Sequence, residues 1–145
     1  MINGSGGIWI ADYGLFQYRR ERDGSDFCTR WDAPELSHTT IAFKPADIFA
    51  FAMLVVEVFT GQEPFGSSMF DTDALLRIGN GKRPKKPVDV QGFGFTDAIC
   101  DLVQRSWAQD PDERPITDDV VETWERLMDR PGWVLRSTPA CLPTF

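Results

Sequence analysis

The chain has 145 residues, of which 42% are hydrophobic and 12% aromatic, so it carries enough apolar side chains for a folded core and is not a disordered segment. Its net charge of −7 argues against a nucleic-acid-binding protein, because such proteins present a basic face to phosphate. Three widely spaced cysteines and one histidine form no zinc-ligand pattern, and with a start that lacks signal-peptide character they predict a cytoplasmic protein.

Near the N-terminus the sequence predicts a short strand followed by a charged loop. Residues 8–11 (Ile-Trp-Ile-Ala) are apolar throughout, as in a buried strand, and they end at the turn 12–14 (Asp-Tyr-Gly). Residues 17–26 are rich in charge and contain one glycine, a composition typical of an exposed loop. Residues 28–36 combine a large aromatic residue with a proline, which predicts an anchored loop that leads into a short helix.

The most apolar segment is residues 46–59, in which only Asp47 and Glu57 are not apolar. A surface helix has one apolar stripe, whereas this segment is apolar all round, which predicts a helix buried on every side. Its β-branched residues leave a buried strand as the alternative, although the segment is longer than a typical strand. It is too short to cross a membrane, which takes about 20 apolar residues, so we expect no membrane span.

A short helix and a basic loop are predicted after this segment. The helix covers residues 71–78, with Asp71 or Thr72 as the N-cap and Gly79 as the residue that ends it. Residues 82–86 (Lys-Arg-Pro-Lys-Lys) belong to an extended basic loop, which we interpret as solvated surface. A patch that binds an acidic partner is the alternative.

Two helices with clear apolar stripes are predicted in the last third of the chain. Thr96 and Thr117 are their predicted N-caps. The residues of the stripes, at helical spacing, are Ile99, Leu102, Val103 and Trp107 in the first helix and Val120, Val121, Trp124, Leu127 and Met128 in the second. The prolines within residues 110–115 predict a rigid turn between the two helices.

Six short motifs follow one another along the chain. They are Asp12-Tyr13-Gly14, Ala33-Pro34-Glu35, Asp47-Ile48-Phe49-Ala50-Phe51-Ala52, Thr60-Gly61 with Pro64-Phe65, Ile78 with Gly81 and Arg83-Pro84, and Trp107 with Asp110-Pro111 and Arg114-Pro115. In this order they resemble the second half of a eukaryotic protein kinase catalytic domain of the tyrosine-kinase-like group. The family pattern has Phe where Tyr13 stands, Trp where Phe49 stands and Gly where Ala52 stands.

The resemblance covers roughly residues 8–128. It implies a mainly α fold, namely an incomplete C-terminal lobe of a protein kinase-like domain with a short β remnant at its N-terminus. We expect residues 1–131 to form this partial domain and residues 132–145 to form a C-terminal tail, to which the sequence assigns no role.

Five of the matching residues have roles that the resemblance implies here. Asp12 is implied to bind the Mg²⁺ that bridges the ATP phosphates, with an ordinary turn carboxylate as the alternative. Glu35 and Arg114 are implied to form a buried ion pair that fixes the activation segment, with two unrelated surface charges as the alternative. Asp47 is implied to accept hydrogen bonds from the backbone of the catalytic loop. Because that loop has no counterpart here, a first-turn carboxylate that favours the helix dipole is the preferred interpretation. Trp107 is interpreted as a core anchor.

Ser25 and Thr29 are candidate phosphorylation sites in the implied activation segment. Four arginines could pair with an added phosphate, namely Arg19, Arg20, Arg22 and Arg30, although a solvated charged loop is the favoured interpretation. Cys28 stands where the family usually has a Thr that bears on the preferred substrate hydroxyl, and Thr29 is next to it.

The family transfers the γ-phosphoryl group of ATP to a protein hydroxyl with the help of Mg²⁺, and the resemblance implies a protein substrate, with Ser or Thr favoured over Tyr. The Gly-rich loop, the lysine-bearing strand and the His-Arg-Asp loop have no counterpart here, since the only histidine, His38, precedes two threonines. We therefore expect this chain to start just after the catalytic loop and to be inactive alone. The alternatives are a pseudokinase fragment, a truncated gene model, or a non-catalytic interaction module. Such a module would bind its partner through the face of the central helix that a long helix and the catalytic loop cover in the family. No oligomeric state is predicted.

Overall fold

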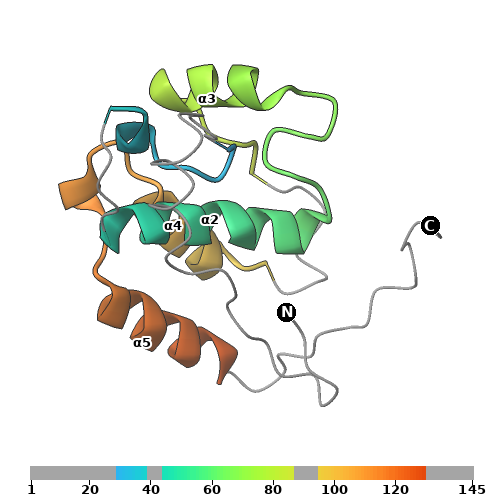
Figure 1. The fold of residues 1–145 in the computed structure, drawn as a ribbon. Coiled ribbons are helices and arrows are strands. Elements are labelled where there is room, and N and C mark those ends of the chain that lie inside the picture. The colour runs from blue at the N-terminus through green and yellow to red at the C-terminus, as the bar shows by residue number, and fades with distance from the viewer. Residues whose placement is uncertain (1–28, 39–43, 87–94, 130–145) are drawn as a thin grey trace, which may run out of the picture.

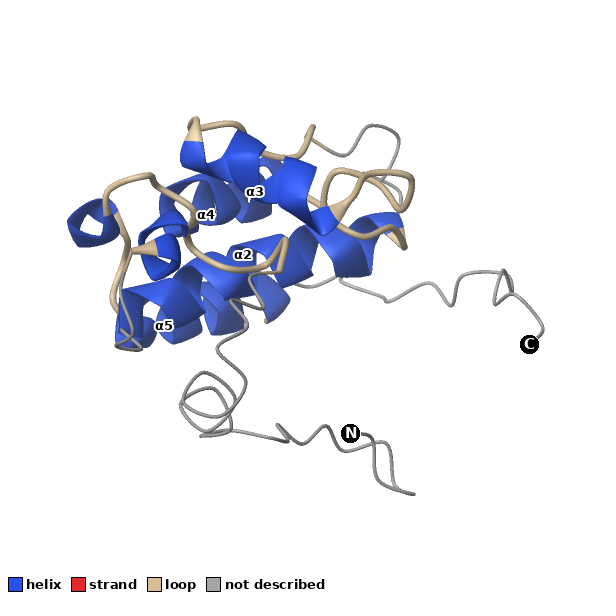
Figure 2. Cartoon of the chain, turned by 45° about the horizontal axis from the view of Figure 1, so that its top comes forward, coloured by secondary structure: helices blue, strands red, loops and turns tan. Residues whose placement is uncertain are grey.

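The structure, a computed structural model, describes residues 29–38, 44–86 and 95–129. In chain order these residues form η1 (Pro34–Ser37), α2 (Lys44–Thr60), α3 (Asp71–Gly79), α4 (Asp97–Ser106), η3 (Pro111–Glu113) and α5 (Thr117–Met128). No strand occurs within these three ranges (Figure 2), so the prediction of a mainly α fold is confirmed. The strand predicted at residues 8–11 lies outside the described residues.

Helix α2 runs through the centre of the molecule. It lies between α3 and α5 in Figure 1, and α4 packs against it. Its span from residue 44 to residue 60 confirms the predicted helix at 46–59 and excludes a strand there. At its C-terminal end the N–H of Gly61 donates to the carbonyl of Glu57 at 2.7 Å, and the φ angle of 65° at Gly61 is one that favours glycine.

Buried side chains form two main clusters around α2. One cluster joins α2 to α4 and α5 and contains Ala52, Val55, Val56, Phe95, Ile99, Cys100, Val103 and Leu127. The other joins α2 to η1 and α3 and contains Ala33, Leu36, Ala46, Phe49, Met53 and Ile78. Trp107 packs against both clusters, so one aromatic side chain links them, in agreement with its interpretation as a core anchor.

One stripe of α2 faces outward. Leu54 is 51% exposed and Val58 is 69% exposed, and Asp47, which shares their side of the helix, is exposed as well. The prediction that α2 is buried on every side is therefore wrong. Among the described residues η1, α3, α4 and α5 cover the other sides, whereas nothing in these ranges packs over Leu54 and Val58.

The predicted start of α4 is confirmed and that of α5 is wrong by one residue. The side-chain oxygen of Thr96 accepts a hydrogen bond from the N–H of Ile99 at 3.3 Å, as an N-cap does. Ile116 is the N-cap of α5 and makes no side-chain cap, so Thr117 is the first residue inside that helix. Val121 is 49% exposed, so its place in the predicted apolar stripe is wrong too.

Both predicted ends of α3 are shifted. Phe70 occupies the N-cap position without a side-chain cap, and Asp71 and Thr72 lie inside the helix. Gly79 is its last residue and keeps an ordinary helical backbone, whereas Gly81 has a φ angle of 72° and donates its N–H to the carbonyl of residue 78 at 2.9 Å. The left-handed turn that ends the helix is therefore at Gly81 and not at Gly79.

Candidate functional site

Glu35 and Arg114 form a two-pronged ion pair between η1 and the segment after η3. The Arg114 Nη1–H and Nη2–H groups donate to the two Glu35 carboxylate oxygens at 2.7 and 2.8 Å. The Arg114 side chain is 0% exposed and that of Glu35 is 19% exposed. The ion pair that the resemblance implies is thus present, and 79 positions of sequence separate its members.

Backbone carbonyls complete the surroundings of Arg114. Its Nη1–H also donates to the carbonyl of Pro45 at the start of α2, at 2.9 Å, and its Nε–H donates to the carbonyl of Ala108 at 3.0 Å. A buried guanidinium needs acceptors for its N–H groups, and this one has them on three separate segments. Arg114 therefore joins η1, the start of α2 and the end of α4 at one point.

Phe49 lies against two guanidinium groups. The Cζ atoms of Arg83 and Arg114 are 4.9 and 5.1 Å from the centroid of its fully buried ring, a distance at which a cation is attracted to the ring face. The Nε–H of Arg83 donates to the carbonyl of Trp107 at 2.8 Å, and its Nη2–H donates to Gln109 Oε1 at 2.7 Å. Phe49 stands where the family motif has Trp, so the ring keeps an aromatic contact at that position.

Burial lowers the pKa of Arg83 to about 10, and the positive charge of Arg114 contributes in the same direction, while Glu35 opposes it. Arg83 was not predicted as a site residue, although it stands in the fifth of the six motifs. The interpretation of residues 82–86 as solvated surface is wrong for two of them, since Pro84 is buried and Arg83 is half-buried.

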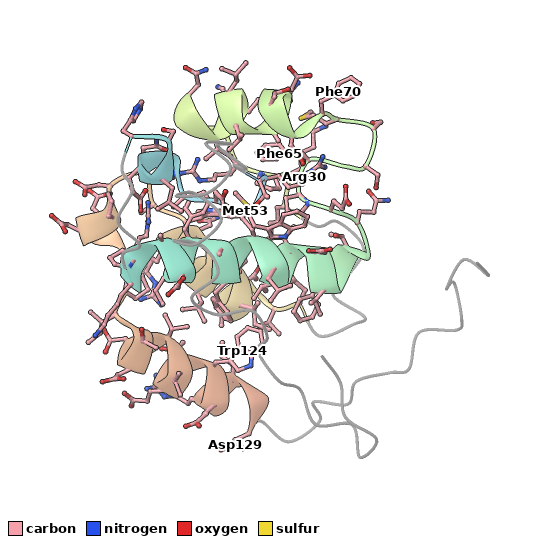
Figure 3. The ribbon with its side chains drawn as sticks, in the orientation of Figure 1. Arg30, Met53, Phe65, Phe70, Trp124 and Asp129 are labelled. Atoms are coloured by element: carbon pink, nitrogen blue, oxygen red, sulfur yellow. The ribbon has the colours of Figure 1, made fainter. Side chains whose placement is uncertain are left out.

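Arg30 is a second buried arginine. It fixes the beginning of residues 29–38, the segment whose later part is held by the Glu35–Arg114 pair. Figure 3 shows it between α2 and α3, beside Phe65. It donates to Asp71 Oδ1 at 2.6 Å, to the carbonyls of Pro64, Gly66 and Met69 at 3.3, 3.0 and 2.6 Å, and lies 3.1 Å from Glu63 Oε2. The favoured interpretation of a solvated loop is therefore wrong for Arg30, which is buried. The alternative, pairing with an added phosphate, is not supported either, because these partners already engage its N–H groups. The bond of Arg30 to Asp71 also explains why that carboxylate does not cap α3.

Hydrogen bonds between Thr29 and Asp32, on either side of Arg30, form a turn at residues 29–32. The Thr29 N–H donates to Asp32 Oδ2 at 2.7 Å, and the Asp32 N–H donates to the Thr29 carbonyl at 2.9 Å. Burial raises the pKa of Asp32, and the hydrogen bonds from Thr29 oppose this shift. Trp31 donates its indole N–H to Glu57 Oε2 on α2 at 2.9 Å. The turn therefore rests on α2 as well as on the loop before α3.

Residues 29–38 are thus held at both ends, by Arg30 at one end and by Glu35 with Arg114 at the other. His38 is exposed. Asp12 and Ser25 lie outside the described residues. Within residues 29–38, 44–86 and 95–129 no group of three or more His, Cys, Asp or Glu residues could hold a metal ion. No helix in those ranges is long and apolar enough to cross a membrane.

A short Ala-Pro-Glu helix fixed to a central apolar helix by a buried arginine is an arrangement of the protein kinase C-terminal lobe. The chain belongs to that family: the model for "Protein tyrosine and serine/threonine kinase" matches residues 1–124. The predicted family is therefore confirmed. The matched range includes Arg30, Glu35 and Arg114, which hold residues 29–38 in place.

Three curated relatives illustrate the range of the family. Atrial natriuretic peptide receptor 2 of Rattus norvegicus is 30% identical over 118 residues, which cover 73% of this chain and 11% of the receptor. A putative serine/threonine-protein kinase/receptor of Acanthamoeba polyphaga mimivirus is 30% identical over 123 residues, 83% of this chain and 7% of that protein. The tyrosine-protein kinase transforming protein ros of UR2 avian sarcoma virus is 34% identical over 115 residues, 74% of this chain and 27% of that protein. The chain thus spans about a quarter or less of these relatives.

Proposed function

We propose that this chain is part of a protein kinase domain that transfers the γ-phosphoryl group of ATP to a protein Ser or Thr hydroxyl, with Tyr as the less favoured acceptor. The observation that carries the proposal is the two-ended anchoring of residues 29–38, which gives a fixed segment on the rim of the helical core. Phosphoryl transfer depends chiefly on positioning, and a segment fixed in this way is suited to receive a protein substrate.

ATP and Mg²⁺ are proposed to bind to parts of the domain other than Arg30, Glu35 and Arg114. Asp12 is the residue proposed to hold Mg²⁺, on the resemblance of its motif alone, and it lies outside the described residues. The printed sequence contains no Gly-rich phosphate loop and no His-Arg-Asp loop, which supply the phosphate contacts and the catalytic base in this family. Residues 1–145 alone are accordingly proposed to be inactive.

The test is phosphotransfer with labelled ATP and Mg²⁺, with a generic protein substrate. We expect the 145-residue chain to incorporate no label above the blank. Reproducible incorporation that the Asp12→Asn variant abolishes would overturn the proposed inactivity. Where the coding sequence upstream of Met1 continues in frame through a Gly-rich loop and a His-Arg-Asp loop, the full domain is assayed as well, and phosphoamino-acid analysis then decides between Ser or Thr and Tyr.

A non-catalytic interaction module is the second candidate function. The observation that favours it is the outward stripe of α2, where Leu54 and Val58 present apolar side chains to solvent. A module with a partner on this stripe should be monodisperse and unfold cooperatively when purified. An aggregating chain that binds hydrophobic dye would favour a fragment of a larger domain instead.

A further inference from the structure

Helix α3 has an uncovered face at the edge of the helical core, on the side of α2 opposite to α5 (Figure 1). Among the large apolar side chains of the described residues, that of Phe70 is the most exposed, at 77%, and Leu76 on α3 is 65% exposed. Figure 3 shows Phe70 at the N-terminal end of α3, pointing away from the core. Two large apolar side chains of one short element are thus left to solvent.

Two unpaired charges share this face with the apolar side chains. Positions 70, 73, 76, 77 and 80 follow one another at steps of three and four, which places them on one side of a helix with 3.6 residues per turn. Asp73 and Arg77 are exposed, and in the described structure neither side chain has an ion pair or a hydrogen bond. Ala74 and Ile78, on the other side of the helix, are fully buried.

The charges on the α3 face indicate which partner fits it. The chain has a net charge of −7, so two copies generally repel each other. The outward side of α5 adds to that repulsion. Its exposed charged residues are Asp118, Asp119, Glu122, Glu125 and Arg126. On the α3 face Asp73 and Arg77 cancel, so neither a strongly basic nor a strongly acidic partner is favoured there. A second α3 that runs antiparallel presents the same two charges in the complementary order.

We propose that two copies of this chain associate through α3, antiparallel about a two-fold axis. In such an interface the same surface meets itself, so every contact occurs twice. An axis beside position 75 places Asp73 of one copy opposite Arg77 of the other, because each lies two residues, or about 3 Å along the helix, from that position. Leu76 then meets the Leu76 of the second copy, and Phe70 lies over position 80 at the end of the second α3.

This dimer is expected to be weak, because each copy contributes only two large apolar side chains to it. Stable interfaces bury about 1,200 Å² or more in total, so we expect a transient dimer with a Kd on the order of 0.1 mM. Sedimentation equilibrium of the 145-residue chain, from about tenfold below to about tenfold above that Kd, measures the association. A monomer mass over the whole range would overturn the proposal.

Charge reversal tests the antiparallel register. Asp73→Arg and Arg77→Asp each place like charges opposite each other twice, so each variant alone should associate about tenfold more weakly than the parent chain. Mixed in equal amounts, the two variants present two cations against two anions and should form a heterodimer at least as tight as the parent dimer. A mixture that associates no better than its components would overturn the proposal.

The chain offers controls for the change in net charge. Asp118→Arg and Arg126→Asp alter the net charge by the same amounts, but at exposed positions of α5. The α5 variants should keep the parent Kd within about twofold. If they weaken the dimer as much as the α3 variants do, the association depends on overall charge and the α3 interface is refuted.

A pair of leucine substitutions tests the apolar part of the interface. Leu76→Asn should weaken the dimer about three- to tenfold, because it removes the contact at the two-fold axis. Leu54→Asn is the matched control, since Leu54 is 51% exposed on α2 and not on α3. Equal effects of the two would indicate association through exposed apolar surface in general and contradict the proposal. Circular dichroism melts check that every variant is folded.

Discussion

Removing the guanidinium of Arg114 is the most informative perturbation of this fold. Arg114→Ala would leave the Glu35 carboxylate, whose side chain is 19% exposed, without its hydrogen-bonded cation, and would remove the guanidinium N–H groups that donate to the carbonyls of Pro45 and Ala108. Breaking a buried ion pair in this way typically lowers the free energy of unfolding by about 3–5 kcal/mol. Because a small domain has a total of about 5–15 kcal/mol, a loss of this size would unfold a large share of the molecules at moderate urea.

An exposed ion pair on α5 supplies a matched control for Arg114→Ala. Arg126 and Glu122 form an ion pair of nearly the same length, 2.8 Å, one turn apart on α5, with side chains 66% and 73% exposed. Since exposed pairs of this type contribute about 0.3–0.5 kcal/mol, Arg126→Ala should leave the stability almost unchanged. Both variants lose an Arg–Glu pair, so the difference between them measures what burial and the additional contacts of Arg114 contribute.

Urea unfolding followed by circular dichroism at 222 nm measures both variants. The double variant Glu35→Gln with Arg114→Met should be less destabilised than the sum of its single variants, by about 2 kcal/mol, because it leaves no lone buried charge. An Arg114→Ala variant within about 1 kcal/mol of the parent chain, or an additive double variant, would refute the reasoning that this pair fastens residues 29–38 to the core.

Three further predictions concern buried polar groups. Arg30→Ala should lower the free energy of unfolding by about 2–4 kcal/mol and speed chymotrypsin cleavage at Phe65 and Phe70, whereas the exposed Arg77→Ala should do neither. Ser106 Oγ has no hydrogen-bond partner in the described structure although the residue is 0% exposed, so Ser106→Ala should leave stability unchanged or raise it by up to about 1 kcal/mol in the same urea assay. Because burial raises the pKa of Asp32 above 3.8, the folded state holds this proton more tightly, and its contribution to stability falls as the pH rises from 3.8 through the folded pKa. The stability of the parent chain relative to Asp32→Asn should therefore decrease over that interval, and a difference that stays constant with pH would contradict it.

The sequence was sufficient for the features that depend on local pattern or on an ordered set of motifs. The length of the apolar segment favoured a helix over the alternative of a buried strand. Thr96 could be predicted as the N-cap of α4 because its side chain accepts a hydrogen bond from the N–H three residues later. The Glu35–Arg114 pair followed from the resemblance alone, because nothing local connects residues 79 positions apart.

The features that were missed depend on tertiary contacts. Arg30 donates to backbone carbonyls 34 to 39 positions away. Because every residue has a backbone carbonyl, the sequence does not indicate which ones a buried arginine will bind. Asp71 does not cap α3 because that same arginine engages it. In a segment that is apolar all round, periodicity cannot indicate which stripe stays uncovered, so the exposure of Leu54 and Val58 was not foreseen from the pattern of α2.

The aromatic ring of Phe49 has a consequence for evolution of the core around it. Two guanidinium groups approach the same ring, and the ring face and the Glu35 carboxylate attract both of them. An aliphatic residue at this position would remove the shared attraction while the mutual repulsion of the two arginines remained, whereas another aromatic residue would keep the attraction. Position 49 is therefore expected to stay aromatic as long as positions 83 and 114 are both arginine.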